Sequence, residues 1–410
     1  MSTVERFVSL WSQLQPIGRD PATGGYLRYT WSRPYFALRD WFQDQARERS
    51  LDVETDANGN LWAWWGDPHA GEAVVTGSHL DSVPYGGAYD GPLGIVSALL
   101  AVDVLRWRGV TPERPIGIVA FAEEEGARFG VACLGSRLLT GELTGERARA
   151  LVDSDGVPLA RAAAEAGLDP SRLGPDKARL ALIGAFVELH IEQGRLLSNR
   201  AGGEALPLGV GSGTWPHGRW RLEFTGEANH AGTTLMPDRH DPMVTCAYTV
   251  LAANKQARLA GANATVGRVA VAPNATNAVP ERVTAWLDAR AADQSTLDDL
   301  VETVVRHATR RAARDGTTVS ATTESISPEV RFDEKLRDRL VTALGGDVPV
   351  IGTGAGHDAA VLAGAAVATA MLFVRNPSGV SHSPAEQATD ADCAAGVEGL
   401  ARVLADLACR

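Results

Sequence analysis

The chain has 410 residues, of which 45% are hydrophobic and 22% are charged. These fractions are typical of a globular protein, and the length allows one large domain and a smaller one. The formal net charge is −11, and no block rich in Lys and Arg interrupts the sequence. We therefore expect a protein that does not bind nucleic acid.

Targeting and membrane signals are weak in this sequence. Glu5 and Arg6 interrupt the first residues, which lack the apolar core of a signal peptide. Residues 359–374 carry no charge, but these 16 positions are fewer than the roughly 18–20 apolar residues that span a bilayer. We expect a buried helix followed by a buried strand there. The four cysteines are scattered without a CxxC pair, which favours a reducing compartment. The predicted location is therefore cytoplasmic, without a membrane partner.

Four apolar runs are predicted to be buried strands, and His or carboxylate residues follow them. A helix is predicted over residues 93–109, where Pro92 precedes an apolar segment that ends at Gly109. Strands that alternate with helices indicate an α/β sheet, in which ligands bind beyond the carboxyl ends of the strands. The predicted strands are 72–77, 115–122, 185–189 and 367–374.

The middle of the chain has a different pattern. Residues 219–225 alternate, with Trp220, Leu222 and Phe224 on one face, as in a half-buried strand. The elements that follow give the order β-α-β-β-α-β, which is that of a ferredoxin-like unit. We expect a lid or dimerisation domain at residues 213–327, inserted between segments 1–212 and 328–410 of the main domain. The other elements are predicted at 241–259 (helix), 265–272 (strand), 282–290 (strand), 296–314 (helix) and 317–325 (strand).

A set of His, Asp and Glu residues could hold two metal ions. Imidazole and carboxylate suit zinc, manganese or cobalt, and each residue lies at or just after a predicted strand end. Asp81 lies two residues beyond His79, where a carboxylate can orient that imidazole. Asp90 lies in a Gly-rich loop, in which the backbone can come close to an ion. The five candidate ligands are His79, Asp90, Glu125, His190 and His382.

Each of these residues also has a structural explanation. A single histidine such as His190, in an apolar context, is more often a core residue than a ligand. Asp90 followed by Gly91 is a common turn signal. Glutamates at 123–125 are usually a solvated acidic face, yet here they directly follow a predicted buried strand. Because three like charges destabilise such a position unless cations neutralise them, the combination favours a metal site.

The motifs together resemble one branch of a known superfamily. The segments 77–83 (GSHLDSV) and 86–91 (GGAYDG) are similar to the metal-binding opening of the co-catalytic aminoacylase/carboxypeptidase superfamily. Four further motifs resemble its N-carbamoyl-L-amino-acid hydrolase and allantoate amidohydrolase branch. They occur in that family's order, and the resemblance covers nearly the whole chain. These motifs are EEEGARF (123–129), HIEQG (190–194), HAGTT (230–234) and SHSP (381–384).

The resemblance implies a mixed-sheet α/β catalytic domain that holds two divalent ions, zinc, manganese or cobalt. It implies that Asp90 bridges the ions, with Glu124 as the catalytic base and Asp81 as a support. His79 and His190 would complete one ion, and Glu125 and His382 the other. The resemblance also implies a homodimer in which His230 reaches the neighbouring subunit's site. The implied substrate contacts are Gln193, His230, Asn277, Arg290 and the loop that contains Gly356.

The substrate contacts keep simpler alternatives. Asn277 lies in a segment for which a turn is the default explanation. Arg290 and Asp288 share a strand face, so an internal ion pair competes with binding of a substrate carboxylate. His230 could instead cap a strand of the inserted domain. We expect Asn277 and Arg290 to lie close enough to meet one carboxylate.

The expected function is metal-dependent hydrolysis of a small ureido compound. The resemblance implies that allantoate or an N-carbamoyl-L-amino acid loses ammonia and carbon dioxide. Two alternatives remain open. The first is an aminoacylase or peptidase that cuts an N-acyl amino acid or a dipeptide. The second is a non-catalytic binding protein stabilised by metal, although such a protein has no use for a general base at Glu124.

Overall fold

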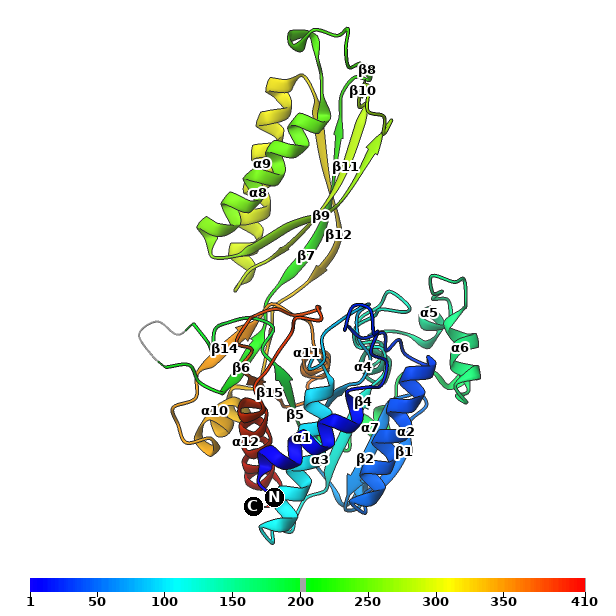
Figure 1. Cartoon of the computed structure of the whole chain (residues 1–410), viewed down its shortest axis with the longest axis vertical. Helices are drawn as coiled ribbons and strands as arrows, with labels where there is room; N and C mark the ends of the chain where they lie inside the picture. The colour runs from blue at the N-terminus through cyan, green and yellow to red at the C-terminus, as the bar shows by residue number, and fades with distance from the viewer. Residues whose placement is uncertain (200–203, 410) are drawn as a thin grey trace. The chain divides into compact units, whose positions relative to one another are not determined.

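The computed structural model describes residues 1–199 and 204–409. The chain forms two compact units (Figure 1). The first unit combines Met1–Gly213 with Arg331–Arg410, and the inserted unit is Thr214–Val330.

Within the described residues, the first unit is built on a nine-stranded mixed sheet. Its strand order is β1-β2-β4-β3-β5-β15-β6-β13, and β14 pairs with β6. The central neighbours β4, β3, β5 and β15 run parallel, whereas β2 and β6 pair antiparallel with their neighbours β4 and β15. The mixed α/β fold expected for this part of the chain is confirmed. The strands are β1 (Asp52–Thr55), β2 (Leu61–Trp65), β3 (Ala73–His79), β4 (Ile116–Phe121), β5 (Ile183–Ile191), β6 (Leu208–Thr214), β13 (Val330–Arg331), β14 (Val350–Thr353) and β15 (Thr369–Val374).

Both faces of the central strands are buried. Val74 and Leu372 belong to the core cluster that includes residues of α3 and α12, whereas their neighbours Val75 and Met371 belong to a second cluster with residues of α11. A sheet covered on both faces explains why these strands read as uninterrupted apolar runs. The helices of this unit are α1 (Thr3–Leu14), α2 (Arg33–Glu48), α3 (Pro92–Trp107), α4 (Leu134–Thr140), α5 (Gly145–Arg149), α6 (Leu159–Glu165), α7 (Lys177–Leu180), α10 (Glu334–Ala343), α11 (Asp358–Gly364) and α12 (Asp390–Ala408).

The uncharged stretch at 359–374 forms most of α11 and then β15, a buried strand. Among the described residues, no helix combines the length and the apolar character that a bilayer span needs. The packed pair α3 and α12 matters for the site, because each helix follows a loop that leaves the carboxyl end of a central strand (Figure 1).

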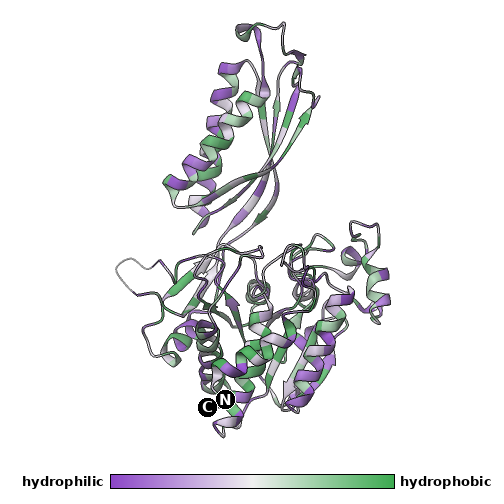
Figure 2. Cartoon of the chain, viewed as in Figure 1, coloured by the Kyte–Doolittle hydropathy of each residue, from purple (hydrophilic) through white to green (hydrophobic). Residues whose placement is uncertain are grey.

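The inserted unit, all of whose residues are described, contains a four-stranded antiparallel sheet in the order β12-β7-β11-β9. Trp220, Leu222 and Phe224 are buried on one face of β7, as their alternation predicts. Two helices complete this core, and Figure 2 shows hydrophobic and hydrophilic residues mixed along both of them. The elements are β7 (His217–Thr225), β8 (Asn229–His230), α8 (Pro242–Ala260), β9 (Asn263–Ala272), β10 (Ala278–Val279), β11 (Arg282–Arg290), α9 (Gln294–Asp315) and β12 (Thr318–Ser327).

Candidate metal centre

The candidate ligands meet at the carboxyl edge of the central parallel strands. His79 is the last residue of β3 and pairs in register with Phe121, the last residue of β4. His190 lies on β5 opposite Phe373 of β15, so it reaches the same edge. The three glutamates follow β4, and His382 follows β15. Parallel strands therefore bring together residues that are far apart in the sequence.

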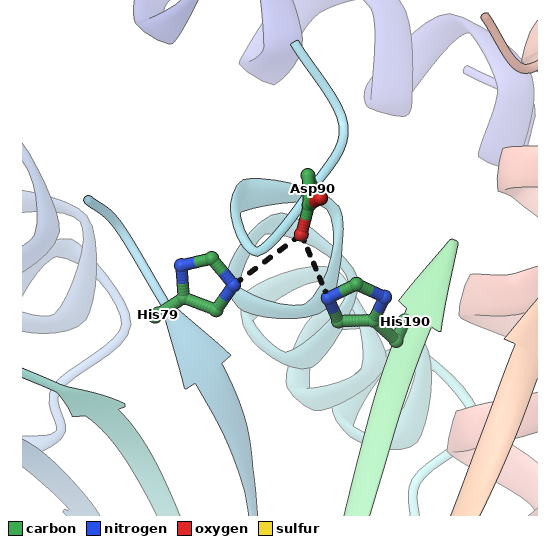
Figure 3. A group of neighbouring side chains, drawn as sticks. All are labelled: His79, Asp90 and His190. Atoms are coloured by element: carbon green, nitrogen blue, oxygen red, sulfur yellow. Dashed lines mark ion pairs between the residues drawn. The ribbon is translucent and has the colours of Figure 1, made fainter. Parts of the chain in front are cut away.

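The first ligand set consists of His79, Asp90 and His190, whose ligand atoms all lie within 4.8 Å of one another (Figure 3). Asp90 Oδ1 lies 3.5 Å from His79 Nε2 and 3.1 Å from His190 Nε2. The Nδ1 atoms of His79 and His190 lie 3.1 and 2.9 Å from the backbone oxygens of Asp81 and Ile191. Each Nδ1 therefore carries the proton, which leaves Nε2 of both rings free as a ligand.

The second ligand set consists of Asp90, Glu125 and His382. His382 Nε2 lies 3.3 Å from Asp90 Oδ2 and 3.6 Å from Glu125 Oε2. The two oxygens of Asp90 thus face two different sets, as a bridging carboxylate requires. All five candidate ligands lie in these two sets.

The chemistry of these atoms fits two divalent cations. Nε2 of His79 and Nε2 of His190 are buried and make no hydrogen bond within the described chain. An unpaired buried nitrogen costs free energy unless something binds it. Imidazole nitrogen and carboxylate oxygen are the ligands that zinc, manganese and cobalt accept.

A third group, Glu188, His190 and His357, also has metal-ligand spacing. Glu188 was not expected at the site from the sequence, and His357 was expected there only as part of the loop that contains Gly356. Because His190 has only one free nitrogen, this group cannot be filled together with the first set. The His357 ring instead packs edge-on against His190, with 4.6 Å between ring centres, and it limits how that imidazole can turn.

The three glutamates are not a solvated face. Glu123 is fully buried and Glu124 is 6% exposed. Asp81 fixes the backbone that carries them, because its two carboxylate oxygens accept hydrogen bonds from the N–H groups of Glu124 (3.2 Å) and Glu125 (3.1 Å). Its side chain also lies 3.6 Å from His79 Nδ1. Asp81 therefore supports one imidazole and two glutamates at once.

Glu124 lies beside the first ligand set but belongs to neither set. Its Oε2 lies 3.7 Å from His79 Nε2, and its Oε1 accepts a hydrogen bond from the Cys133 thiol at 3.4 Å. Burial raises the pKa of Glu124 well above its ordinary value, and the carboxylates of Asp358 and Glu125 raise it further. A carboxylate with a raised pKa is a stronger base than an exposed one, which suits a residue that accepts and returns a proton.

The electrostatics of both sets favour cations. Burial alone would lower the pKa of His79, yet the surrounding carboxylates of Glu124, Asp81 and Asp90 raise it well above its ordinary value. A hydrogen bond to Asp90 raises the pKa of His382 to about 9. Burial and the nearby Asp90 carboxylate raise the pKa of Glu125 to about 7. Each shift stabilises positive charge, or disfavours further negative charge, at this place.

The backbone is specialised around the ligands. Gly91 has a φ of +88°, and an added Cβ would lie 2.4 Å from Cε1 of His79. Only glycine allows Asp90 to come this close to the imidazole. Glu123 and His382 also have left-handed φ values of 56° and 53°. Such conformations are unfavourable for residues with a side chain and are concentrated at functional sites.

Of the predicted substrate contacts, Gln193 lies at the ligand cluster. Its Nε2 donates to Asp90 Oδ2 at 2.9 Å and to the Ser381 hydroxyl at 3.2 Å. Gly356 is exposed in the loop before α11, next to His357, and an added Cβ would have no atom within 4 Å.

His230 and Asn277 lie together in the inserted unit. His230 pairs with Ala278 in the short β8–β10 ladder, and the carbonyl of Asn277 accepts the N–H of Ala231 at 2.9 Å. His230 Nδ1 accepts hydrogen bonds from the N–H groups of Gly232 and Thr233 at 3.0 and 3.1 Å. This tautomer makes Nε2–H of the exposed His230 ring a hydrogen-bond donor.

The expectation that Asn277 and Arg290 meet one carboxylate is wrong within a single chain. The β8–β10 ladder adjoins the end of β11 that begins at Arg282, whereas Arg290 is the last of the nine residues of that strand. Eight steps along a strand separate the two ends by about 27 Å. Arg290 also makes the competing ion pair, donating to both oxygens of Asp288 at 2.8 and 3.2 Å.

Other residues at the site were not identified from the sequence. Glu188 is a charged residue inside an apolar strand, and that anomaly could have been noticed. Cys133 and Glu386 had no comparable signal, because their importance depends on contacts with distant residues.

Comparison with known proteins is consistent with this geometry. A family model described as peptidase family M20/M25/M40 matches residues 75–406. The N-carbamoyl-L-amino acid amidohydrolase of Geobacillus stearothermophilus is 37% identical over 97% of this chain and 98% of its own. The allantoate amidohydrolase of Escherichia coli is 33% identical over 96% of each chain. A crystal structure of a hydantoinase/carbamoylase family amidase from Burkholderia ambifaria has a TM-score of 0.86 at 31% identity, covering 98% of this chain and 97% of its own.

The family model covers well over half of the chain. The residues that converge at the sheet edge lie in the sequence motifs that resemble those of this family. The chain therefore belongs to the peptidase family M20/M25/M40.

Proposed function

We propose that this protein is a dimetal hydrolase that cleaves the ureido C–N bond of an N-carbamoyl-L-amino acid or of allantoate. The observation that carries the proposal is the arrangement of Asp90, whose two oxygens face two separate ligand sets with Glu124 beside them. The relatives named for these two substrates align over nearly the full length of the chain.

In this proposal His79, Asp90 and His190 hold one divalent ion, and Asp90, Glu125 and His382 hold the other. When bound, zinc, manganese or cobalt ions supply Lewis acidity that lowers the pKa of a water molecule and polarises the substrate carbonyl. The protein supplies the remaining functions, which are binding, orientation and proton transfer.

Glu124 acts as the base. It accepts a proton from the attacking water as the water oxygen bonds to the ureido carbon, and it then passes the proton to the departing nitrogen. The Asp81 carboxylate accepts the backbone N–H groups of Glu124 and Glu125 and so keeps Glu124 next to the ligand sets. His230 Nε2–H donates to the carbonyl oxygen as negative charge develops there. Cleavage of this first C–N bond leaves a carbamate, which then splits into carbon dioxide and the second nitrogen compound. The final products are the free amino acid, or ureidoglycine from allantoate, together with ammonia and carbon dioxide.

The remaining contacts recognise the substrate. Gln193 lies among the ligands and can reach a small molecule bound there. Arg290 is proposed to bind the substrate carboxylate with its planar guanidinium, exchanging Asp288 for the substrate. The loop that contains Gly356 is proposed to line the substrate pocket, because its next residue, His357, packs against the ligand His190.

We also propose that the protein is a homodimer, with the inserted unit serving as the dimerisation domain. His230 and Asn277 lie about 27 Å from Arg290 along the inserted unit, given the rise of a strand. A substrate of a few ångströms cannot contact both ends of one unit. Two copies related by a two-fold axis can supply Arg290 from one subunit and His230 with Asn277 from the other.

The substrate assignment is tested by ammonia release. Purified protein loaded with Mn²⁺, Co²⁺ or Zn²⁺ is assayed against allantoate, several N-carbamoyl-L-amino acids and the matching N-acetyl amino acids and dipeptides. Ammonia should form from ureido substrates, with little cleavage of the acetyl compounds. Faster cleavage of N-acetyl amino acids or dipeptides would instead support an aminoacylase or peptidase and would contradict the proposal.

Complementation tests the shared site. His230→Ala and Arg290→Ala homodimers should each be nearly inactive, because every site lacks one residue. In a heterodimer of the two variants, one of the two sites has both residues. Random exchange at equal concentrations should restore about a quarter of wild-type activity. If verified subunit exchange restores none, the two residues serve the site of the same chain and the proposed sharing is wrong.

A reducing, cytoplasmic location is also part of this proposal. All four cysteines lie in the described part of the chain and are free thiols. Free cysteines are usual where glutathione and thioredoxin keep thiols reduced.

A further inference from the structure

Glu386 is a buried carboxylate that has no role in the proposed mechanism. It is 5% exposed and lies in the loop between β15 and α12, four residues after His382. Its Oε2 accepts hydrogen bonds from the backbone N–H groups of Tyr89 at 2.8 Å and Asp90 at 3.1 Å. These donors lie in the loop between β3 and α3, and Asp90 is 296 positions away from Glu386 in the sequence.

The other oxygen of Glu386 extends the connection to the ligands. Oε1 accepts from the Ser381 hydroxyl at 3.4 Å, and the same hydroxyl lies 3.2 Å from Asp90 Oδ2. One carboxylate therefore contacts both the backbone that carries Asp90 and the residue that precedes His382.

The loop that carries Asp90 is shaped to accept this carboxylate. A Cβ added to Gly87 would lie 2.2 Å from Glu386 Oε2 and 2.6 Å from Glu386 Cβ. The Gly87 backbone thus passes directly over the glutamate, and any side chain at that position would displace it.

We propose that Glu386 is a positioning residue that holds the bridging Asp90 and His382 at the spacing the second metal ion needs. His79 and His190 are fixed by β3 and β5, which are central strands of the sheet. Asp90 and His382 lie on two separate loops, and Glu386 is the buried side chain that joins them. Its loss should therefore affect the Asp90–Glu125–His382 set more than the set that contains the two strand histidines.

This inference rests on the proposed dimetal site, and metal affinity tests it independently of catalysis. Metal-free protein is titrated with Co²⁺ or Mn²⁺ in competition with a chromophoric chelator, which gives a dissociation constant for each ion. Removing the partners that orient metal ligands usually weakens affinity about 10–100-fold. Glu386→Ala should raise the second dissociation constant by that factor and change the first by much less.

Two further variants separate positioning from general stability. Glu386→Gln keeps an oxygen that can accept from Tyr89 and Asp90, and it gains an amide that can donate to Ser381. Both metal dissociation constants should therefore remain within about threefold of wild type. That change is far smaller than the weakening expected when an orienting partner is removed. Asp56 offers a matched control, because it is 4% exposed and accepts the N–H groups of Asn58 and Asn60 in the loop between β1 and β2, which holds no candidate ligand. Asp56→Ala should lower the melting temperature and leave both affinities unchanged.

The outcomes are distinct. If wild-type protein binds fewer than two ions, the proposed dimetal site itself is wrong. If wild type binds two and Glu386→Ala binds both equally tightly, the positioning role is wrong. The role is equally overturned if Asp56→Ala weakens binding of the second ion as much as Glu386→Ala does, or if Glu386→Gln behaves like Glu386→Ala.

Discussion

Adjacent glutamates with different tasks allow a sharp test of the site. Glu124→Gln preserves the shape of the side chain, so its contact with Cys133 and its place beside His79 can persist. The amide cannot accept the proton from water. General acid–base catalysis typically contributes 10²–10⁴-fold, so kcat should fall by about that factor, which corresponds to about 3–5 kcal/mol of lost transition-state stabilisation. Metal content should remain that of the wild type.

Glu125→Gln makes the same chemical change one residue later and serves as the matched comparison. Glu125 Oε2 lies 3.6 Å from His382 Nε2 in the second ligand set, and a neutral amide is a weaker ligand for a divalent ion. This variant should lose about one ion per subunit on gel filtration, as measured by elemental analysis alongside ammonia release. Metal loss in Glu124→Gln with retention in Glu125→Gln would show that the two roles are reversed.

Two further predictions concern stability and backbone geometry. In the folded, metal-free protein the pKa values of Glu123 and Glu125 are raised from 4.5 to about 7 by burial and by neighbouring carboxylates. Between pH 4.5 and 7 the folded state retains protons that the unfolded chain releases. The free energy of unfolding that these two groups contribute is therefore fully present below pH 4.5 and is lost as pH rises through 7. Calorimetry should show the metal-free melting temperature falling from about pH 5 to 7.5 and Mn²⁺ restoring it, and a rise with pH would contradict this reasoning. Gly91→Ala should weaken metal binding, because the added Cβ would lie 2.4 Å from the His79 ring. Gly109 is the control, since it also has a positive φ but no atom lies within 4 Å of an added Cβ. Gly109→Ala should therefore cost only about 1–2 kcal/mol of stability and leave metal affinity unchanged. Equal metal affinities in the two glycine variants would show that the close approach at His79 has no role.

The chemistry of the site was more visible in the sequence than the fold around it. His79, His190 and the three glutamates stand out because polar residues directly follow apolar runs, and the ends of parallel strands must share one edge. The strand β7 was visible because buried residues alternate along it with partly or fully exposed ones. Local pattern was sufficient for these features.

Other features depend on contacts that local pattern does not encode. The strand β6 (LGVGSGT) has three glycines and little apolar character, so no strand was predicted there. Asn277 and Arg290 were expected to be close because few residues separate them in the sequence. Most of those residues form the extended strand β11, which places its two ends far apart. Glu386 is an ordinary loop glutamate in the sequence, and only its hydrogen bonds to Tyr89 and Asp90 reveal its connection to the site.

Reconstitution with metal tests directly whether hydrolysis by this protein depends on two bound metal ions. Protein made metal-free with a chelator, and verified by elemental analysis, is titrated with Mn²⁺, Co²⁺ or Zn²⁺ while ammonia release from an N-carbamoyl-L-amino acid and from allantoate is followed. We expect no activity without metal and full activity once the ligand sets around Asp90 have both bound an ion. Full activity in the verified metal-free protein would contradict it.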